Sequence, residues 1–594
     1  MRFNLFKFRK KGTSKMKIYS NIVPADKVRE VQGETLQIIS DALSNSFGPN
    51  GSTTAFVKNI DPKGVNIAME YTKDGHTIVK NIQFTNPIER SVQDLLTEMT
   101  RYIVKEVGDG TTSAIMLCND VFHYLMESES AKKETPAVLI NKIHTLITKV
   151  KQNILDQKRD CTLDDIKDIA LISTNNNEDV ASTLQQVYKK FGLDVYIDVG
   201  VSTEYDTIIK EYDGMTLETG FTDECFINSP DGESSIIRNP FIYCFNDPID
   251  TPEMLALVAK IIESNIINPC TRPQETPIPT VIFCAGRISP DTSSYFENVV
   301  MFMKKYQNVP LLIVSDIHQD YLFNDIAKMC GAPLIKKYLD PDMQTRDIEE
   351  GLAPNLDSVV NFYGKAEMIQ ADHFKTKIIR PQKMYNDDGT ESDDYKALLG
   401  AVEAMITKAK NEDAGIEAIA RAKKRYHSLK GNMVDYLVGG MTNSDRNNLK
   451  AAVEDAVLNC RSAVVDGVGY GANFMAFSEF RKLNNTRKDN PKFFVDDYDD
   501  SEIIDVFDKA YTKLMGELYG KSYPADAVED IIEKCAKFGH PLNIATDRFD
   551  HKVLSSIKSD VAILETIDKI LTLMFTCNQY LVQTPMHNLY SQDK

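Results

Sequence analysis

A β-rich middle between two helical arms most constrains how this chain of 594 residues folds. Short β-rich runs alternate there with helical segments, as is typical of an α/β domain. The β-rich runs are 193–200, 240–245, 279–286 and 309–316, and the helical segments are 251–264, 291–306 and 319–329.

On both sides of this block the apolar residues recur at helical spacing. The helical patterns cover 28–46, 86–107, 111–127, 132–155, 390–428 and 444–466, and they continue to about 583 after a charged loop or hairpin at 480–502. We therefore predict a multi-domain α plus α/β protein, in which both arms pack as one discontinuous helical domain around an inserted α/β domain.

Charge and composition exclude several classes of protein. A net charge of −18 disfavours nucleic acid as the main partner, because no overall basic field attracts phosphates. The sequence contains no run of eighteen uninterrupted apolar residues, so it does not predict a membrane span. The ten cysteines form no CxxC pair and have no histidine at ligand spacing, which favours reduced thiols and no zinc. Residues 1–17 carry seven basic and no acidic residues, and we interpret them as a basic tail rather than a targeting peptide.

Three glycine-containing stretches have the character of anion sites. They are SFGPNG (46–51), GDGTTS (108–113) and VDGVGYGAN (465–473). Glycine lets backbone N–H groups approach a phosphate without a Cβ in the way. A helix that begins at Thr111 also directs its free N–H groups and its positive dipole end at the same anion.

Asp109 lies at the centre of the second stretch, where a bare carboxylate beside a phosphate would be repelled. A magnesium ion removes this conflict, since it binds carboxylate and phosphate oxygens together. The sequence therefore predicts a phosphate and magnesium site at residues 108–113, with the hydroxyls of Thr111, Thr112 and Ser113 as further ligands.

Plainer interpretations compete with this hypothesis. A Walker P-loop and a strand-linked GxGxxG are both absent, and GDG is a common turn. TKDG (72–75) reads as a hairpin turn that carries Asp74. Asp455 lies off an apolar helical stripe together with Asn459 and Ser462, so spacing alone favours a solvated helix face there.

Taken together, the motifs resemble the group I (GroEL-type) chaperonins, in order and close to the family's spacing. The matching segments are LSNSFGPNG, YTKDGHTIVK, VGDGTTSA, VEDAVLNCRSAVVDGV and LNIA, with YDGMTLETGFTDECFIN and NPFIY between them. The resemblance covers about residues 20–580. It identifies the chain as a divergent relative of a family of ring-forming, ATP-driven machines that bind unfolded polypeptides.

The resemblance implies three domains. The equatorial ATP-binding domain comprises 1–133 and 467–594, the intermediate hinge domain 134–212 and 433–466, and the apical polypeptide-binding domain 213–432. It implies a homo-oligomeric ring, ATP and Mg²⁺ as cofactors with K⁺ left open, and unfolded polypeptides as partners, without nucleic acid or membrane. The resemblance does not decide whether a co-chaperonin lid is needed. The expected location is cytoplasmic, with an organellar or viral setting left open.

The resemblance also assigns nucleotide-site residues. Asp109 matches the magnesium ligand, Asp455 the carboxylate that orients the attacking water, and Asp74 a second carboxylate near that water. The other nucleotide contacts would be Ser46, Phe47, Gly48, Pro49, Lys73, Gly110, Thr111, Thr112, Ser113, Ala472, Asn543, Ile544, Ala545 and Asp560. The register at Asp560 leaves Ser559 as an alternative, and Tyr470 and Ala472 stand where the family has glycine-rich sequence.

Polypeptide capture would be hydrophobic. Phe221 and Phe226 match the family's apical segment beneath the groove, and Leu322, Phe323 and Ile326 are expected to present apolar surface on the helix after VPLLIVSD. Two candidates remain for the second groove helix, 251–264 with Leu255 and Val258, and 291–306 with Tyr295, Phe296 and Val299.

Two further hypotheses remain beside the folding machine. One is a chaperonin-derived holdase or assembly scaffold without significant ATP turnover, and the other is an unrelated acidic helical adaptor. Retention of Asp74, Asp109 and Asp455 favours an ATPase, because a decayed site has no physical reason to keep three carboxylates that resist desolvation.

Overall fold

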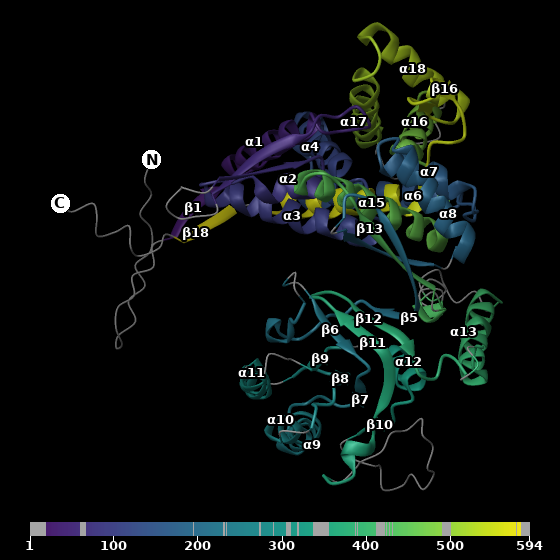
Figure 1. The fold of residues 1–594 in the computed structure, drawn as a ribbon. Helices are drawn as coiled ribbons and strands as arrows, with labels where there is room; N and C mark the ends of the chain where they lie inside the picture. Colours follow the sequence, from purple (N-terminus) through teal and green to yellow (C-terminus); the bar gives the residue numbers. More distant parts are fainter. Residues whose placement is uncertain are drawn as a thin grey trace, which may run out of the picture. The chain divides into compact units, whose positions relative to one another are not determined.

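The computed structural model describes residues 20–583 of the chain (Figure 1). The gaps within this range are 60–66, 194, 203, 230–231, 233, 273–274, 289, 305–309, 318–319, 337–355, 387, 389, 412–417, 419–421, 423–424, 427, 431, 490–500 and 578. The basic segment 1–17 lies outside the described residues. No helix among those that the structure describes is long and apolar enough to cross a membrane.

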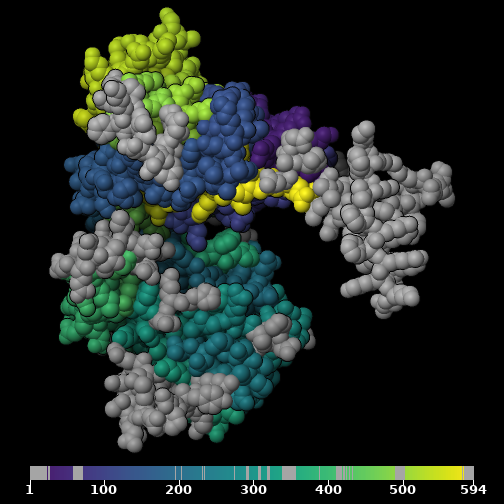
Figure 2. All heavy atoms as spheres, turned by 180° about the vertical axis from the view of Figure 1, so that it is seen from behind, coloured from purple at the N-terminus to yellow at the C-terminus, as the bar shows by residue number. Residues whose placement is uncertain are grey.

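The chain forms two compact units. The helical unit combines residues 1–182 with 451–594, and the α/β unit comprises 183–450. Both ends of the chain therefore build one unit, which confirms the expectation of a discontinuous helical domain with an α/β insertion. Within the helical unit, N-terminal segments (blue) and C-terminal segments (yellow-green) adjoin on the face seen in Figure 2.

The helical unit is built mainly of helices, with short strand pairs. Its helices are α1 (Ala25–Ser44), α2 (Gly75–Asn81), α3 (Pro87–Glu106), α4 (Thr111–Glu127), α5 (Glu129–Lys133), α6 (Pro136–Leu155), α7 (Asp165–Ser173), α16 (Phe474–Asp489), α17 (Ser501–Gly520), α18 (Ala525–Phe538) and α19 (Ile557–Thr576). Helices α8 (Glu178–Phe191) and α15 (Asn443–Asp466) run across the division between the units.

The strand pairs of this unit are all antiparallel. They are β1 (Ser20–Pro24) with β18 (Gln579–Gln583), β2 (Thr54–Asn59) with β3 (Ile67–Thr72), β14 (Val468–Tyr470) with β17 (Leu554–Ser556), and β15 (Leu542–Asn543) with β16 (Arg548–Phe549). The pair β14–β17 joins segments almost ninety residues apart, and strand β17 leads directly into α19.

Helix α4 is the centre of this unit. Twelve of its seventeen residues are buried, and α1, α3, α17 and α19 pack against it. A helix that is apolar on nearly all sides must be covered on nearly all sides. Helices from both ends of the chain therefore fix the position of the N-terminus of α4, where the predicted phosphate site lies.

The α/β unit contains a ten-stranded mixed sheet. Its main order is β4–β13–β5–β12–β11–β7–β8–β9, with β10 paired to β7 and β6 to β11. The strands are β4 (Tyr196–Val201), β5 (Ile208–Leu217), β6 (Ser235–Arg238), β7 (Phe241–Phe245), β8 (Thr280–Cys284), β9 (Leu311–Val314), β10 (Leu334–Ile335), β11 (Gly364–Ala371), β12 (Thr376–Pro381) and β13 (Asn432–Val438).

The strands β7, β8 and β9 are parallel, as the alternating sequence pattern predicts. The helices of this unit are α9 (Pro252–Ile262), α10 (Asn268–Thr271), α11 (Pro290–Lys304), α12 (Asp320–Cys330) and α13 (Asp393–Asn411), with shorter turns η1 (Glu224–Phe226), η2 (Glu263–Ile267) and η4 (Val359–Asn361).

Three local predictions are wrong. The stretch from 502 to 583 is not helical throughout, because β15, β16 and β17 separate α18 from α19 and β18 follows α19. Residues 480–489 belong to α16 rather than to a loop, because Phe480 is fully buried against Phe507 and Tyr511. Residues 72–75 are not a hairpin turn but the junction between strand β3 and helix α2.

A buried ionic cluster ties three strands of the sheet together. Lys377 of β12 contacts Asp198 of β4 at 2.6 Å and Asp435 of β13 at 2.7 Å, and Lys375 contacts Asp198 at 3.0 Å. Burial alone would lower the pKa of Lys377, but Asp198 and Asp435 raise it to about 12. Among the described residues, Asp435 pairs only with Lys377, and burial keeps its pKa raised. Asp198 pairs with both Lys375 and Lys377, which together hold its pKa below the ordinary value.

We expect Lys377→Met to destabilise the α/β unit by about 3–5 kcal/mol, because it leaves Asp435 buried without a counter-charge. Lys375→Met is the matched control, with an expected loss under about 1 kcal/mol, since the Lys375 side chain is 40% exposed and Lys377 still pairs with Asp198. Denaturant unfolding of both variants measures this difference, and equal losses would contradict it.

Candidate functional site

The GDG turn needs both of its glycines. Gly108 has φ 84° and Gly110 has φ 98°, in the left-handed region that disfavours side chains. A Cβ on Gly108 would lie 2.6 Å from Cβ of Leu458 and 3.2 Å from the carbonyl oxygen of Asp455. A Cβ on Gly110 would lie 2.8 Å from Ile563. The glycines thus allow α15 and α19 to pack directly against this turn.

Two helix N-termini meet beside the turn. Helix α4 begins at Thr111, with Gly110 as its N-cap and no side chain capping its free N–H groups. A Cβ on Gly75, the first residue of α2, would lie 2.5 Å from Oγ1 of Thr112 and 2.9 Å from Oγ1 of Thr111. Uncapped N–H groups and hydroxyls therefore face one small region, which is suited to an anion.

Asp109 lies between these helix ends. Its Oδ1 accepts a hydrogen bond from the Gly110 N–H at 2.6 Å. Burial raises the pKa of Asp109, and hydrogen bonds from Gly110 and the Ser173 hydroxyl oppose this rise. A carboxylate with few donors in such a place is stabilised by a bound cation.

Asp74 is the N-cap of α2. Its carboxylate accepts hydrogen bonds from the N–H groups of His76 at 3.2 Å and Thr77 at 2.8 Å, and from the Thr77 hydroxyl at 2.5 Å. The cap fixes the carboxylate at the point where α2 meets α4. Sequence reasoning placed this carboxylate in the site through the resemblance, but it missed the capping role.

Asp455 completes a group of three carboxylates. Its pKa is raised well above the ordinary value, first by burial and then by the negative charges of Asp74 and Asp109, with Glu454 contributing. Asp74 and Asp109 therefore lie close enough to Asp455 for their charges to act on it. In the ranges that the structure describes, no lysine or arginine forms an ion pair with Asp109 or Asp455.

The polar face of α15 is buried, so spacing alone gave the wrong interpretation of it. Asn459 is fully buried and Ser462 is 6% exposed. Asn459 contacts Ser173 and the segment Leu554–Ser556, and the Ser462 hydroxyl lies 2.7 Å from that of Ser556. Apolar periodicity could not reveal this because the buried partners are themselves polar.

The three aspartates have the chemistry of divalent-cation ligands but do not form a metal site by themselves. Asp74, Asp109 and Asp455 supply oxygen atoms, the ligands that Mg²⁺ prefers. Among the described residues, no cluster of three or more His, Cys, Asp or Glu has the arrangement of a complete metal site. Any Mg²⁺ here would therefore need further oxygens, such as phosphate oxygens at the N-terminus of α4.

The loop SFGPNG is a tight turn after α1. Ser46 and Phe47 are buried, Gly48 has φ 76°, and a Cβ on Gly51 would lie 2.2 Å from the Ser46 carbonyl oxygen. Lys521 donates to the carbonyl oxygens of Ser44 at 2.5 Å and Phe47 at 2.7 Å. Pro49 is half-buried within the same turn.

Lys521 is a residue that sequence reasoning missed. Burial lowers its pKa, and the positive charge of Lys73 lowers it further, although Glu517 opposes this. Lys73 therefore lies near the same loop. No short motif marks Lys521, because it lies in the turn after α17, some 470 residues away in sequence.

The third glycine-containing stretch also reaches the site. Ala472 and Asn473 both have positive φ, 58° and 60°, where the family has glycine-rich sequence. Asn473 donates to the Ser113 hydroxyl at 2.9 Å, which connects this loop to the first turn of α4. Tyr470 turns toward His551 instead, with its hydroxyl 2.5 Å from Nδ1. Asn473 is the second residue that the sequence analysis missed.

The segment expected to meet the base forms the hairpin β15–β16. Asn543 accepts from the Ala545 N–H at 3.0 Å, Ile544 is half-buried and Ala545 is exposed. Asp560 is 2% exposed and accepts from the Ala476 N–H at 3.2 Å, and burial raises its pKa to about 7. Ser559, the alternative register, has its Oγ 3.5 Å from the Cβ position of Gly110. The structure therefore places Ser559 at the GDG turn and directs Asp560 to the start of α16.

Comparison with known proteins identifies the family. Residues 39–519 match the TCP-1/cpn60 chaperonin family. This chain belongs to that family.

Two similar chaperonins are GroEL of Anaplasma phagocytophilum, 23% identical over 472 residues, and GroEL of Anaplasma marginale (strain Florida), 24% identical over 468 residues. The alignments cover 77% of this chain, and 77% and 76% of those proteins. The fold is similar to that of the chaperonin gp146 from the Pseudomonas aeruginosa bacteriophage EL, solved in the presence of ATP-BeFx. That match has a TM-score of 0.74 at 16% identity and covers 95% of this chain and 99% of gp146.

Most of the polypeptide-binding residues predicted for this chaperonin are buried. Phe226, Phe323 and Ile326 are fully buried and Phe221 is 7% exposed, so the expectation that Phe323 and Ile326 present apolar surface is wrong. They belong to the core of the α/β unit, where α12 packs on the sheet. Leu322 is half-buried, and Met301 of α11, which sequence reasoning missed, is 58% exposed.

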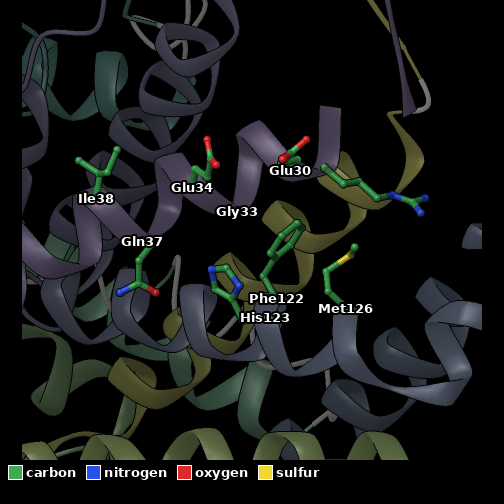
Figure 3. A pocket seen from close by; sticks show the side chains of 9 residues that line it. Glu30, Gly33, Glu34, Gln37, Ile38, Phe122, His123 and Met126 are labelled. Carbon is green, nitrogen blue, oxygen red and sulfur yellow. The ribbon is translucent and has the colours of Figure 1, made fainter. Parts of the chain in front are cut away.

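A separate hollow lies between α1 and α4 (Figure 3), with a volume of about 620 Å³. Its lining residues are Arg29, Glu30, Gly33, Glu34, Gln37, Ile38, Phe122, His123 and Met126. Phe122 lies eleven residues after Thr111, about 16 Å along the helix. None of the predicted nucleotide residues lines this hollow.

We expect Asp455→Asn to stabilise the ligand-free protein at neutral pH, because burial and the charges of Asp74 and Asp109 disfavour an ionised Asp455. A raised pKa makes the folded state most favourable when Asp455 is protonated. The gain should therefore be largest above the raised pKa and disappear as the pH falls below the ordinary value near 3.8. A gain of roughly 1 kcal/mol would raise Tm by about 2–4 °C. Thermal unfolding from pH 4 to 8 measures it, with exposed Asp526→Asn as control, and a gain that is equal at every pH would contradict it.

Proposed function

We propose that this chain is an ATP-dependent chaperonin that binds Mg²⁺-ATP at the site of Asp74, Asp109 and Asp455. Hydrolysis of the ATP is coupled to the folding of non-native polypeptides. The observation that carries the proposal is the close packing at the uncapped N-terminus of α4, where a Cβ on Gly108 would lie 3.2 Å from the carbonyl oxygen of Asp455 and a Cβ on Gly75 would lie 2.5 Å from Oγ1 of Thr112. Burial raises the pKa of Asp455, and the charges of Asp74 and Asp109, which raise it further, support the proposal. An anion site and a cation site thus share one location, as a magnesium-bound triphosphate requires.

The residues take distinct roles in this proposal. The N-terminus of α4, with Thr111, Thr112 and Ser113, holds the phosphates, and Asp109 holds the metal. The bound Mg²⁺ supplies charge neutralisation at the phosphates. Asp455 orients the attacking water and accepts its proton, with Asp74 as a second acceptor. A nearby cation would lower the raised pKa of Asp455 and keep it ionised for this role.

The proposal extends to assembly and capture. The chaperonin relatives support a homo-oligomeric ring that encloses non-native polypeptides in the cytoplasm. The three-domain division at residues 133, 212, 432 and 466 stays part of the proposal, as does K⁺ as a further ion. We place polypeptide capture on α11 and α12, because Met301 of α11 is 58% exposed and Leu322 of α12 is half-buried, whereas on α9 Leu255 is half-buried and Val258 is fully buried.

We expect Asp455→Ala to retain Mg²⁺-ATP binding while phosphate release falls by about 10²-fold or more, because only water activation is lost. Asp109→Ala should lose the magnesium dependence of ATP binding. Exposed Asp526→Ala is the control. Phosphate release and equilibrium binding of a fluorescent ATP analogue separate the two effects.

Wild-type turnover in Asp455→Ala would contradict the assigned role. Tight ATP binding by the wild-type protein without any phosphate release would instead support a chaperonin-derived holdase or scaffold. Negative-stain images with and without ATP would show whether rings form.

A further inference from the structure

The hollow between α1 and α4 has a largely apolar lining that is open to solvent. Ile38 of α1 and Phe122 and Met126 of α4 contribute the apolar side chains, and Figure 3 shows those of Phe122 and Met126 pointing from α4 toward α1. Ile38 is 51% exposed. The volume of about 620 Å³ is that of a typical ligand pocket. The hollow is therefore large enough to receive several apolar side chains of a docked segment.

Two glutamates give the α1 side of the hollow a negative charge. Glu30 and Glu34 lie one turn apart on α1, line the hollow and are exposed. Within the described ranges, no lysine or arginine forms an ion pair with either of them. Arg29 also lines the hollow, but it donates to the Phe575 carbonyl oxygen at 3.4 Å and lies over the Phe575 ring. Like charges one turn apart repel each other, so a basic partner would be favoured here.

A buried nitrogen of His123 adds a hydrogen-bonding group to the lining. Its Nε2 has no hydrogen-bond partner among the described residues, although it is shielded from solvent. A Cβ on Gly33 would lie 3.2 Å from Cε1 of His123, so α1 covers this ring closely. A buried polar atom without a partner costs free energy. A peptide backbone in the hollow offers both a donor and an acceptor, and so satisfies either tautomer of the ring.

The N-terminal segment of the chain, which lies outside the described residues, has a complementary composition. Residues 1–17 carry seven basic and no acidic residues. The apolar residues of this segment are concentrated near its start, at Phe3, Leu5, Phe6 and Phe8. Apolar side chains match the lining of the hollow, and basic side chains match its two glutamates.

The length of the chain allows this segment to return to the hollow. Phe8 precedes Ser20, the first residue of β1, by twelve residues, which span up to about 40 Å. Gly33 lies near the middle of the hollow on α1. The distance from Ser20 to Gly33 is at most about 30 Å, even if β1 and α1 lay in one line. The aromatic residues therefore lie far enough from β1 to reach the lining.

We propose that residues 2–8 dock in the hollow between α1 and α4 of their own chain, with the aromatic side chains against the apolar lining and the basic side chains beside Glu30 and Glu34. Docking removes apolar surface from water and neutralises two repelling carboxylates. The proposal is independent of the proposed function, because none of the predicted nucleotide residues lines this hollow.

The test compares the full chain with a variant that lacks residues 2–17. A fluorescent peptide with the sequence of residues 1–17 is titrated with each protein at low salt, and its anisotropy is measured. The deletion variant should bind the peptide, and the full chain should bind it at least about tenfold more weakly, because its own segment competes at a high effective concentration. Equal affinities, or no binding by the deletion variant, would overturn the proposal.

The glutamates are tested in the deletion variant. Glu30→Gln/Glu34→Gln should weaken peptide binding about tenfold, and added salt should reduce the difference, since it screens exposed charges. Glu529→Gln/Glu533→Gln is the matched control, because these two glutamates are also exposed and four residues apart, on α18. Equal losses in the two pairs contradict docking in the hollow, because they indicate attraction to the overall negative charge.

The apolar contacts are tested in the peptide. The substitutions Phe3→Ser, Phe6→Ser and Phe8→Ser together keep every basic residue, and they should weaken binding about tenfold or more. Ile38→Ser in the deletion variant removes exposed apolar surface from the other side of the contact and should also weaken binding. Undiminished binding of the serine peptide would show that the hollow plays no part.

Cross-linking of the unaltered full chain decides which copy supplies the segment. A zero-length carbodiimide reagent should join Lys7 to Glu30 or Glu34, and mass spectrometry identifies the linked peptides. An equal mixture of isotopically labelled and unlabelled chains distinguishes links within one chain from links between chains. Links that are mostly between chains assign the hollow to a second copy and overturn the proposal, as does the absence of any link to these glutamates.

Discussion

The negative charge of Asp74 and Asp109 close to Asp455 is the constraint on which the rest of this site depends. Asp74, Asp109 and Asp455 are held together although burial and like charge raise the pKa of Asp455 well above its ordinary value. Such an arrangement persists only where the surrounding packing fixes each carboxylate. The packing around α4 does this, because α1, α3, α17 and α19 leave its N-terminus no freedom to move away from α15.

The glycines allow these packed segments to approach one another closely. Gly108 and Gly75 have no room for a Cβ, because α15 lies against one and the first turn of α4 against the other. Each carboxylate therefore comes from a different segment, namely the cap of α2, the turn before α4 and the face of α15. A cation that bound all three regions would relieve repulsion that the ligand-free fold must otherwise sustain.

The sequence predicts the helices well where burial follows a simple period. Helix α4 begins and ends at the expected residues, and the parallel strands β7 to β9 lie within the expected runs. The sequence pattern fails to predict burial where the buried face of a helix contacts polar side chains. Asn459 and Ser462 break the apolar stripe of α15, but they face Ser173, Ser555 and Ser556 rather than water. Local patterns contain no information about such partners, since these come from segments far away in sequence.

The same limit applies to two predictions at the sites, the exposure of Phe323 and Ile326 and the register at Asp560. Phe323 and Ile326 have the apolar character of a capture surface, yet that character serves equally well for the core beneath α12, and only the packing of the sheet decides between them. Asp560 satisfies a motif by residue type, yet helical rotation by one residue directs Ser559 to the GDG turn. Residue type thus suggested the chemistry, whereas the direction of each side chain depended on contacts between distant segments. A hydroxyl at the GDG turn and a carboxylate buried beside α16 are thus neighbours in sequence on the same helix. For that reason the hydrogen bonds of Asn473 and Asn459, which join distant segments, help to set the position of the site although no motif names them.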